Sequence, residues 1–404
     1  MVVTRLYQLH KIEFKKIREA STYFEASSKF KISITITHIM KKYIKILGLL
    51  AITAIQFSCS SNDAADTEAV NPPDATDTFI RASDVSFLPQ MESLGTKFYS
   101  NGKAEGMLTT LKNAGCNTVR IRLWKNPVNG RSGLSEVKQL AQKARQAGLR
   151  VWLTVHYSDN WADPAIQTTP KEWENLSFTD LKTAVSDYTS TIITEINPDI
   201  IQIGNEINSG LLWPQGNLIS NEEQCIALLT AASATVRSKA PNTKIMIHYA
   251  GVNGGATDWF FTKMKSVDYD YIGLSYYPVW HGKDLTEVKN TIDALGEKFG
   301  KKVLIAETAY PFTLLHNDQT NNIVGTNDQL VPGYPATPAG QRTFVMDIKN
   351  IVKTSQFGQG FAYWGGEWVA FKGQQSTSGS TFENQALYSF DNNALSVMEA
   401  FSKD

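Results

Sequence analysis

The feature that most constrains the fold of this sequence is a regular alternation of short apolar segments with longer helix-like ones after residue 77. Eight segments are rich in β-branched or other apolar residues, and helical patterns separate most of them. Near-continuous apolar strands that alternate with helices indicate a parallel sheet covered on both faces. The predicted strands are residues 79–87, 118–124, 150–157, 199–206, 244–250, 270–277, 302–308 and 359–365.

Eight such units in roughly 325 residues fit a closed (β/α)8 barrel, which typically takes about 250 residues plus insertions. Several helical patterns stop at a glycine, as at Gly115, Gly148 and Gly300. A doubly wound open sheet is the alternative, but the glycine-rich phosphate turn typical of its first strand is absent. We therefore predict the α/β class and a single TIM barrel over residues 78–404. The clearest predicted helices are residues 102–114, 134–147, 179–196, 221–240 and 285–299.

The sequence before the barrel predicts a targeting signal followed by a tether. Three lysines separate Met40 from an apolar run at residues 46–55, and Cys59 follows a serine. A basic stretch, a short apolar run and a small residue before cysteine resemble a bacterial lipoprotein signal, and the run is too short to span a bilayer. We expect residues 1–59 to be an upstream extension plus this signal, with translation starting at Met40 and Cys59 lipidated. A plain signal peptide with an incidental cysteine is the alternative.

Residues 60–77 are polar, acidic and marked by prolines, which is typical of a flexible tether. Two cysteines remain, Cys116 and Cys225, and they form either one disulfide or two free buried thiols. The 39 basic residues balance 39 acidic ones, which argues against nucleic acid as the main partner. Nine tryptophans and fifteen tyrosines suit the apolar faces of sugar rings, although aromatic residues also fill cores.

A barrel of this kind carries its active site where the strands end. Six predicted strands close on polar or aromatic side chains, which a purely structural explanation does not account for. One of them, His156, is either a contact in the active site or a buried core histidine with satisfied hydrogen bonds. The side chains at these strand ends are Arg122 and Trp124, His156 and Asp159, Asn205 and Glu206, Tyr276 and Tyr277, Glu307, and Trp364.

Two of these residues form a predicted catalytic pair. Glu206 and Glu307 close strands four and seven, which face each other across part of the barrel mouth. Glycoside hydrolysis needs two carboxylates about one bond, and at about 5–5.5 Å one acts as nucleophile and the other as acid and then base. Arg122 is placed to keep a nearby nucleophile ionised. The alternative for either glutamate alone is a helix N-terminal charge or a solvated loop residue.

The sequence lacks the motifs of two other classes of hydrolase. No Gly-x-Ser-x-Gly elbow is present, and the six histidines do not fall into His-Glu-x-x-His spacing. A serine hydrolase and a zinc hydrolase of that type are therefore excluded.

Longer motifs make the chain resemble glycoside hydrolase family 53, the endo-β-1,4-galactanases of clan A. The resemblance covers roughly residues 78–402. It departs from the family at Arg81-Ala82-Ser83-Asp84, where a glycine–alanine pair commonly precedes the aspartate. The motifs are residues 82–86 with 89–92, 117–124, 156–164, 202–207, 210–214 and 383–387.

The resemblance implies a retaining mechanism with Glu206 as acid/base and Glu307 as nucleophile, and no cofactor for the chemistry. It implies that Asn205 binds the sugar 2-hydroxyl, and that Trp364 lies under the cleaved sugar. Arg122 and one of the two tyrosines would hold the nucleophile. Further cleft contacts would be Trp161, Asp163 and Trp213.

Some bacterial members of this family carry a structural calcium ion between the loops after strands seven and eight. Asp318, Thr320 and Asn322 place oxygen donors at alternate positions in the first of these loops, as calcium prefers. Only one of the three is a carboxylate, so a polar turn without an ion is the alternative.

The expected substrate is β-1,4-galactan or type I arabinogalactan. A clan A mannanase or glucanase is the second hypothesis, because the catalytic pair is common to these enzymes. A non-enzymatic glycan-binding lipoprotein is the third, but such a protein would be expected to have lost a catalytic glutamate. We expect a monomer, anchored by lipid to the bacterial outer membrane on the cell surface.

Overall fold

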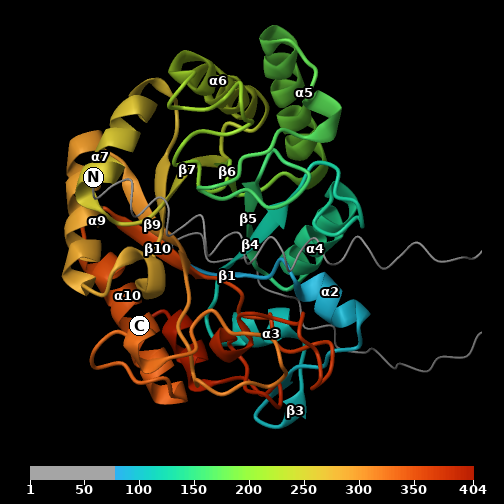
Figure 1. Ribbon diagram of the computed structural model, residues 1–404, viewed down its shortest axis with the longest axis vertical. Helices are drawn as coiled ribbons and strands as arrows, with labels where there is room; N and C mark the ends of the chain where they lie inside the picture. The colour runs from blue at the N-terminus through green and yellow to red at the C-terminus, as the bar shows by residue number, and fades with distance from the viewer. Residues whose placement is uncertain (1–77) are drawn as a thin grey trace, which may run out of the picture. The chain divides into compact units, whose positions relative to one another are not determined.

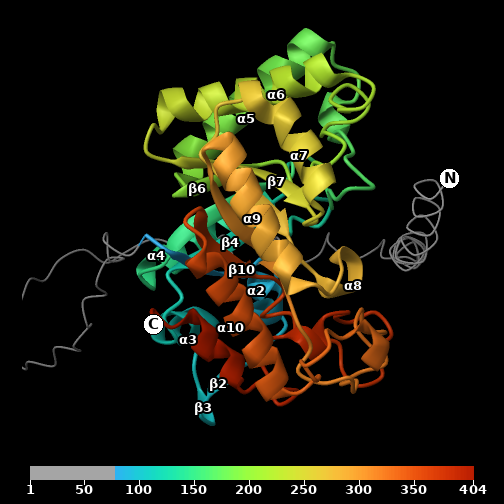
Figure 2. The same ribbon diagram turned by 90° about the vertical axis from the view of Figure 1, so that its left-hand side faces the viewer.

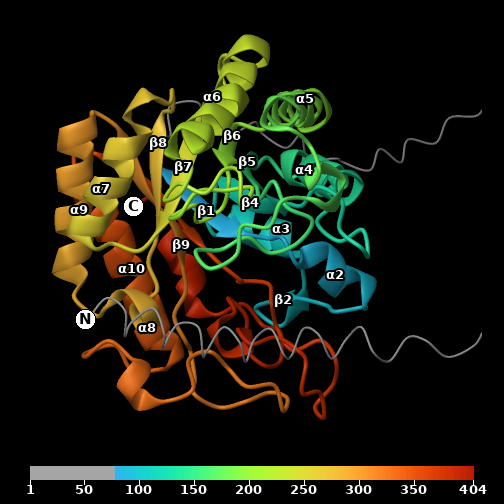
Figure 3. The ribbon, with the colours of Figure 1, turned by 45° about the horizontal axis from the view of Figure 1, so that its top comes forward.

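Eight parallel strands close into a barrel in the computed structural model, which describes residues 78–404. Neighbouring strands follow the order β1-β10-β9-β8-β7-β6-β5-β4, and β4 pairs with β1 to close the sheet. Figure 3 shows these strands surrounded by helices. The predicted fold class, a single (β/α)8 barrel, is confirmed. The strands are β1 (Ile80–Asp84), β4 (Thr118–Leu123), β5 (Arg150–Val155), β6 (Ile200–Ile203), β7 (Lys244–Ala250), β8 (Tyr271–Ser275), β9 (Lys302–Thr308) and β10 (Gly358–Tyr363).

A helix follows each of the first seven barrel strands, and a 3₁₀ segment, η5 (Ser396–Phe401), follows the eighth. Figure 2 shows α9 and α10 side by side on the outside of the sheet. The main helices are α3 (Met107–Asn113), α4 (Leu134–Gln146), α5 (Phe178–Ile196), α6 (Glu222–Lys239), α7 (Gly254–Lys263), α9 (Leu285–Phe299) and α10 (Pro338–Thr354). Short elements are α2 (Leu88–Ser93), β2 (Tyr99–Ser100), β3 (Lys103–Ala104), η1 (Lys171–Trp173), η2 (Met264–Ser266), α8 (Pro278–His281), η3 (Asn327–Gln329) and η4 (Glu383–Gln385).

Local sequence explains where the helices begin and end. The predicted helix 285–299 coincides with α9, where the Asp284 side chain accepts a hydrogen bond from Thr286 N–H and Gly300 ends the helix in the left-handed conformation. The predicted helix 102–114 is too long, because β2 and β3 form a hairpin before α3. Asn101 and Gly102, both with positive φ, make its two-residue turn, which is the type of turn that an Asn-Gly pair favours.

The inside of the barrel has an apolar end, which we call the barrel floor. Strand residues that point inward fill it, and Trp152 is the largest of them. A separate and larger core lies between the strands and the surrounding helices. The barrel floor consists of Ile80, Ala82, Trp152, Ile200, Met246, Leu304, Ala306 and Ala362.

Two long loops, residues 309–337 after β9 and 364–395 after β10, lie beside each other at the mouth of the barrel (Figure 1). Backbone hydrogen bonds join them, including Ile323 N–H to Thr381 O at 3.0 Å. Cys116 and Cys225 are free and buried, so the alternative with two thiols holds. Within residues 78–404, no helix is both long and apolar enough to cross a membrane. The predicted signal, Cys59 and the tether lie outside the described residues.

Candidate active site

The two predicted carboxylates meet at the mouth of the barrel. Glu206 follows β6 and Glu307 lies on β9. One oxygen of each carboxylate and one ring nitrogen of His248, on β7, all lie within 4.8 Å of one another. This separation is short enough for the two carboxylates to flank a single bond.

Irregular backbone brings both glutamates into place. Leu274 pairs with Ile305 and Ser275 pairs with Glu307, so β9 contains one extra residue at this point. Without that bulge, the alternation from Leu304 would point Glu307 out of the barrel, and re-aiming a side chain is a common use of a bulge. Glu206 has φ = +49°, a left-handed conformation that is uncommon for a residue with a side chain and is often found at functional sites.

A buried arginine, Arg120 on β4, binds Glu307. Its Nη2 donates to Glu307 Oε1 at 2.6 Å and to Asn205 Oδ1 at 3.0 Å, and its Nη1 donates to Asp84 Oδ2 at 2.7 Å. The prediction that Arg122 holds the nucleophile is therefore wrong. Both arginines point into the barrel, but Arg120 is paired with Asp84 in the sheet and is one step deeper.

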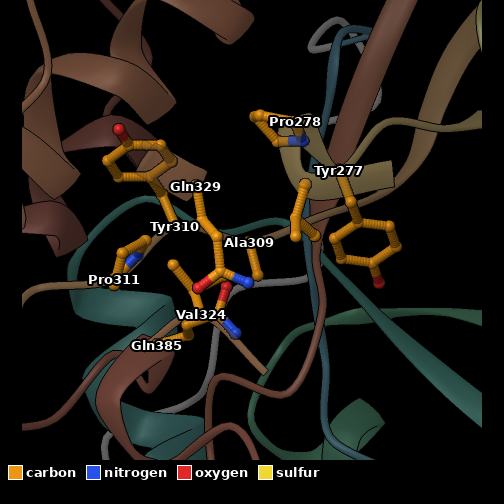
Figure 4. Close-up of a pocket in the computed structure, with 9 residues that line it drawn as sticks. Tyr277, Pro278, Ala309, Tyr310, Pro311, Val324, Gln329 and Gln385 are labelled. Atoms are coloured by element: carbon orange, nitrogen blue, oxygen red, sulfur yellow. The ribbon is translucent and has the colours of Figure 1, made fainter. Parts of the chain in front are cut away.

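The second hydrogen bond to Glu307 comes from Tyr277, whose hydroxyl donates to Oε2 at 2.9 Å. Of the two tyrosines that the sequence left open, Tyr277 is thus the one at the site. Tyr276 turns away, and its hydroxyl donates to Gly282 O. Figure 4 shows the Tyr277 hydroxyl pointing away from a small pocket lined by residues such as Ala309 and Tyr310, so that pocket lies behind the site.

Sequence reasoning missed three polar residues under Glu206. Ser275 Oγ lies 2.6 Å from Glu206 Oε1 and 3.0 Å from His248 Nε2. His248 Nδ1 accepts from Glu206 N–H at 3.2 Å and lies 2.9 Å from Gln202 Nε2. A histidine within the apolar run of β7, facing inward like Met246, was the available signal.

Electrostatics separate the two carboxylates. Burial and then the negative charge of Glu307 raise the pKa of Glu206 well above its usual value, with only Ser275 and Arg120 opposing the shift. Burial also raises the pKa of Glu307, but Arg120 and Tyr277 counteract it directly with an ion pair and a hydrogen bond. The pair therefore holds its proton on Glu206, whereas Glu307 is the ionised member.

Aromatic rings form one wall of the site around Arg122. The guanidinium carbon lies 4.2 Å from the ring centroid of Trp161, 4.4 Å from that of Trp124 and 4.6 Å from that of Phe87. Trp161 is 40% exposed, so it keeps a free face. Trp364 packs edge-on against Phe382 with centroids 4.6 Å apart and is half-buried. Exposed indole faces at the mouth suit the apolar faces of sugars.

Asn205 and His156 are buried at the site with fixed orientations. Asn205 Oδ1 accepts from Arg120 and Gln202, and its Nδ2 donates to Ala162 O at 2.9 Å. His156 Nδ1 accepts from Ala162 N–H at 3.1 Å, so its proton is on Nε2. Burial keeps the pKa of His156 well below its usual value.

Three other predicted contacts use their polar atoms to brace loops. Asp159 accepts from Asn126 N–H and Lys171 N–H, and Asp163 accepts from Ala165 N–H and Ile166 N–H. Trp213 Nε1 donates to Ser209 O at 3.0 Å, and its ring is half-buried. Their roles toward a substrate stay predictions.

Two sets of side chains resemble metal ligands, and only one fits. Glu206, His248 and Glu307 are close enough, but both ring nitrogens of His248 are engaged in hydrogen bonds and Arg120 already neutralises Glu307. In the loops, by contrast, Asp318 Oδ2, Asn322 Oδ1 and Glu383 Oε2 are buried without a hydrogen-bond partner within the described residues.

This loop set fits calcium. Its donors are oxygens only, and it includes a second carboxylate, Glu383, that the sequence did not suggest. Glu383 Oε1 accepts from Asn317 N–H at 2.7 Å and from Asp318 N–H at 3.3 Å, which fixes it against the predicted ligands. The negative charge of Asp318 adds to burial in raising the pKa of Glu383, and a cation would relieve that repulsion.

Comparisons with known proteins agree on one family. Residues 80–401 match the model of glycosyl hydrolase family 53. The chain is 32% identical to an arabinogalactan endo-beta-1,4-galactanase of Cellvibrio japonicus, over 88% of this chain and 97% of that protein. It is 30% identical to an endo-beta-1,4-galactanase of Bacillus subtilis, over 80% and 85% respectively. The solved catalytic domain from Ignisphaera aggregans is 36% identical and superposes with a TM-score of 0.77, covering 82% of this chain and 98% of that one.

Proposed function

The chain belongs to glycosyl hydrolase family 53, and on that premise we propose that it is a retaining endo-β-1,4-galactanase acting on galactan or type I arabinogalactan. Relatives named as galactanases align over most of its length, which supports the substrate. The observation that carries the mechanism is the Glu206–Glu307 pair, with one oxygen of each carboxylate within 4.8 Å of the other and with Glu307 as the member that forms an ion pair with Arg120. Inverting enzymes need a wider gap of about 6.5–9.5 Å between carboxyl groups to admit a water.

In the first step, the Glu307 carboxylate attacks the anomeric carbon while Glu206 gives its proton to the leaving oxygen. The glycosidic bond breaks as the bond to Glu307 forms, and the result is a covalent glycosyl-enzyme. Arg120 and Tyr277 keep Glu307 ionised and oriented before the attack. Asn205, fixed by Arg120, is placed to donate to the 2-hydroxyl, a bond that strengthens in the transition state.

In the second step, Glu206, now a carboxylate, removes a proton from water, and the water oxygen attacks the anomeric carbon. The bond to Glu307 breaks and both glutamates return to their starting states. Two inversions give net retention. The first product should therefore carry the same anomeric configuration as the substrate, which NMR of the fresh hydrolysate measures directly. An inverted first product would contradict this mechanism.

The substrate class needs its own test, because the catalytic pair does not distinguish galactan from mannan or glucan. We expect reducing sugar to be released from linear β-1,4-galactan and not from β-1,4-mannan or β-glucan. The product profile on galactan should consist of oligosaccharides early in the reaction, as internal cleavage requires. Release from mannan at an equal or higher rate would support the second hypothesis, and binding without release would support the third.

We also propose that calcium joins the loops after β9 and β10, through Asp318, Thr320 and Asn322 together with Glu383. A chelator should lower the midpoint of thermal unfolding by several degrees, and added calcium should restore it, because a ligand that binds only the folded state stabilises it. Asp318→Asn should remove most of this response. Equal unfolding midpoints with chelator and with calcium would contradict the proposal.

Finally, we propose that the protein is exported and held at the outer membrane, facing the cell surface, by a lipid on Cys59. The lysines and apolar run before Cys59 support this placement. Membrane fractionation and fatty-acid labelling of the full chain should succeed for the wild type and fail for Cys59→Ser. Labelling of that variant would rule out Cys59 as the anchor.

A further inference from the structure

The hydrogen bonds under Glu206 have a direction that the structure determines. Glu206 N–H is a backbone donor, and it points at His248 Nδ1 across 3.2 Å. Nδ1 must therefore be an acceptor, since a protonated Nδ1 would face another proton. A neutral imidazole that accepts at Nδ1 carries its proton on Nε2. His248 is fully buried, and burial followed by the charge of Arg120 keeps its pKa well below the usual value, in agreement with the neutral form.

The direction continues through Ser275. His248 Nε2–H donates to Ser275 Oγ at 3.0 Å, so the serine must use its own proton elsewhere. Within residues 78–404, its other hydrogen-bond partner is Glu206 Oε1, at 2.6 Å. If Glu206 Oε1 carried the proton instead, the buried Ser275 hydroxyl would lose its acceptor, and a buried donor without an acceptor is unfavourable. Oε1 is therefore an acceptor.

His248 also holds the backbone of Glu206. The N–H of Ile207 donates to His248 O at 3.1 Å, next to the bond from Glu206 N–H to the imidazole of the same residue. These two bonds clamp the peptide groups on either side of the residue whose φ is +49°. One histidine thus fixes the backbone of Glu206 directly and its carboxyl group through Ser275.

We propose that His248 and Ser275 are positioning residues which keep Oε1 of Glu206 as a hydrogen-bond acceptor, so that the acid proton is carried by Oε2. This inference rests on the proposed role of Glu206 as acid/base. No proton moves along the chain of bonds. Its effect is to select the oxygen that protonates the leaving group and to prevent the carboxyl group from rotating. The proton then starts in line with its acceptor, as efficient general acid catalysis requires.

The experiment compares two aryl β-1,4-galactobiosides that differ in their need for the acid. A 2,4-dinitrophenyl group leaves without a proton, whereas a phenyl group needs one. In Ser275→Ala we expect kcat/KM for the phenyl substrate to fall about 10- to 100-fold, which is less than the roughly 10²- to 10⁴-fold that general acid catalysis contributes in full, because Glu206 itself is still present. For the dinitrophenyl substrate it should stay within about threefold, because bond cleavage no longer depends on the acid.

The pH profile provides a second readout. The charges and titratable groups that face Glu206 are Glu307, Arg120, Asp163, His248 and Tyr277. Ser275→Ala leaves all of them in place and removes a bond that favours the carboxylate form. The alkaline limb of kcat/KM should therefore move to higher pH. Ser275→Cys, which keeps a weak donor of similar size, should give intermediate values on both readouts and guards against loss of folding in the alanine variant.

A matched control is Ser233→Ala. Ser233 is equally buried, but its hydroxyl donates to Asp268 O from α6, away from the site. The Ser233→Ala variant should leave unchanged both the ratio of kcat/KM for the two substrates and the alkaline limb of the pH profile. The positioning role is wrong if Ser275→Ala lowers kcat/KM equally for both substrates and leaves the alkaline limb of the pH profile where it is. Azide rescue of Glu206→Ala on the dinitrophenyl substrate tests the acid/base assignment separately, and its failure would contradict the proposed function instead.

Discussion

The two ends of the barrel interior share strands β1, β6, β7 and β9 but have opposite chemistry. The barrel floor contains only apolar side chains and a buried tryptophan. Above it lies what we call the polar layer, in which nearly every side chain forms a hydrogen bond or ion pair. The polar layer consists of Asp84, Arg120, Gln202, His248, Ser275 and Glu307.

A single inward-facing step along β1, β6 and β7 separates the two ends. Ala82 is followed two residues later by Asp84, Ile200 by Gln202, and Met246 by His248. Inward-facing residues recur every second position, so the change from apolar to charged takes place within about 7 Å. The barrel floor contributes stability through burial, whereas the polar layer places charges where they cost stability unless they are paired. The comparison predicts that substitutions at the two ends have opposite consequences.

The largest effect is expected from Glu307→Gln in the polar layer. Activity should fall on the order of 10⁴-fold or more, the scale seen when a nucleophile is deleted. The thermal unfolding midpoint should stay the same or rise, because burial disfavours the charge of Glu307 and Arg120 keeps its ion pair with Asp84, so no buried charge is left without a partner. Kinetics on galactan and a melting curve measure both. The control is Glu297→Gln on the exposed face of α9, which should change neither.

A substitution in the barrel floor should lower stability and have little effect on activity. Trp152→Ala is expected to lower the free energy of unfolding by about 3–5 kcal/mol, as large-to-small changes in a core do. Well below the unfolding midpoint, kcat/KM should fall far less than in Glu307→Gln, because the Trp152 ring reaches the catalytic groups only through Arg120, whose guanidinium carbon lies 5.8 Å from its centroid. Denaturant unfolding and galactan kinetics give the two values. Trp259→Ala, at a tryptophan 43% exposed on α7, should barely affect either. An unfolding loss at Trp152 no larger than at Trp259 would remove the contrast between the two ends.

The barrel floor was more predictable from sequence than the polar layer. Apolar runs locate the strands, and Gly115, Gly148 and Gly300 mark the ends of helices, because burial and backbone conformation act locally. The strand ends also identified the glutamates. The sequence did not predict which arginine binds Glu307, because Arg120 and Arg122 share one face of β4. The pairing of Asp84 with Arg120 in the sheet decides that Arg120 is the one that reaches Glu307.

Non-local geometry explains the other omissions. The bulge that turns Glu307 inward appears as a register shift between β8 and β9, which no single segment encodes. Tyr276 and Tyr277 are adjacent, and the end of β8 determines which of them points to the site. His248 and Ser275 gain their meaning from Glu206, which is distant in sequence and adjacent in the barrel.

The last prediction concerns the pH dependence of stability and Glu367, a fully buried carboxyl beside the polar layer. Its Oε1 accepts from Phe87 N–H at 2.7 Å, and its Oε2 is buried without a partner within the described residues. Burial, followed by the negative charge of Asp84, raises its pKa from 4.5 to about 8. The folded protein therefore keeps this proton between pH 4.5 and about 8, whereas the unfolded chain releases it.

Because the folded state binds the extra proton, stability must fall as pH rises through that interval, by up to about 1.4 kcal/mol per pH unit from this group. Gln cannot titrate, so in Glu367→Gln only the other groups of the chain make the free energy of unfolding depend on pH. The difference in the free energy of unfolding between the variant and wild type should therefore grow, in favour of the variant, as pH rises. Urea unfolding at several pH values between about 5 and 8 measures the difference, with Glu297→Gln as the control. Parallel curves for wild type and Glu367→Gln would mean that Glu367 is ionised in the folded protein, and that the polar layer tolerates one more buried charge than its hydrogen bonds suggest.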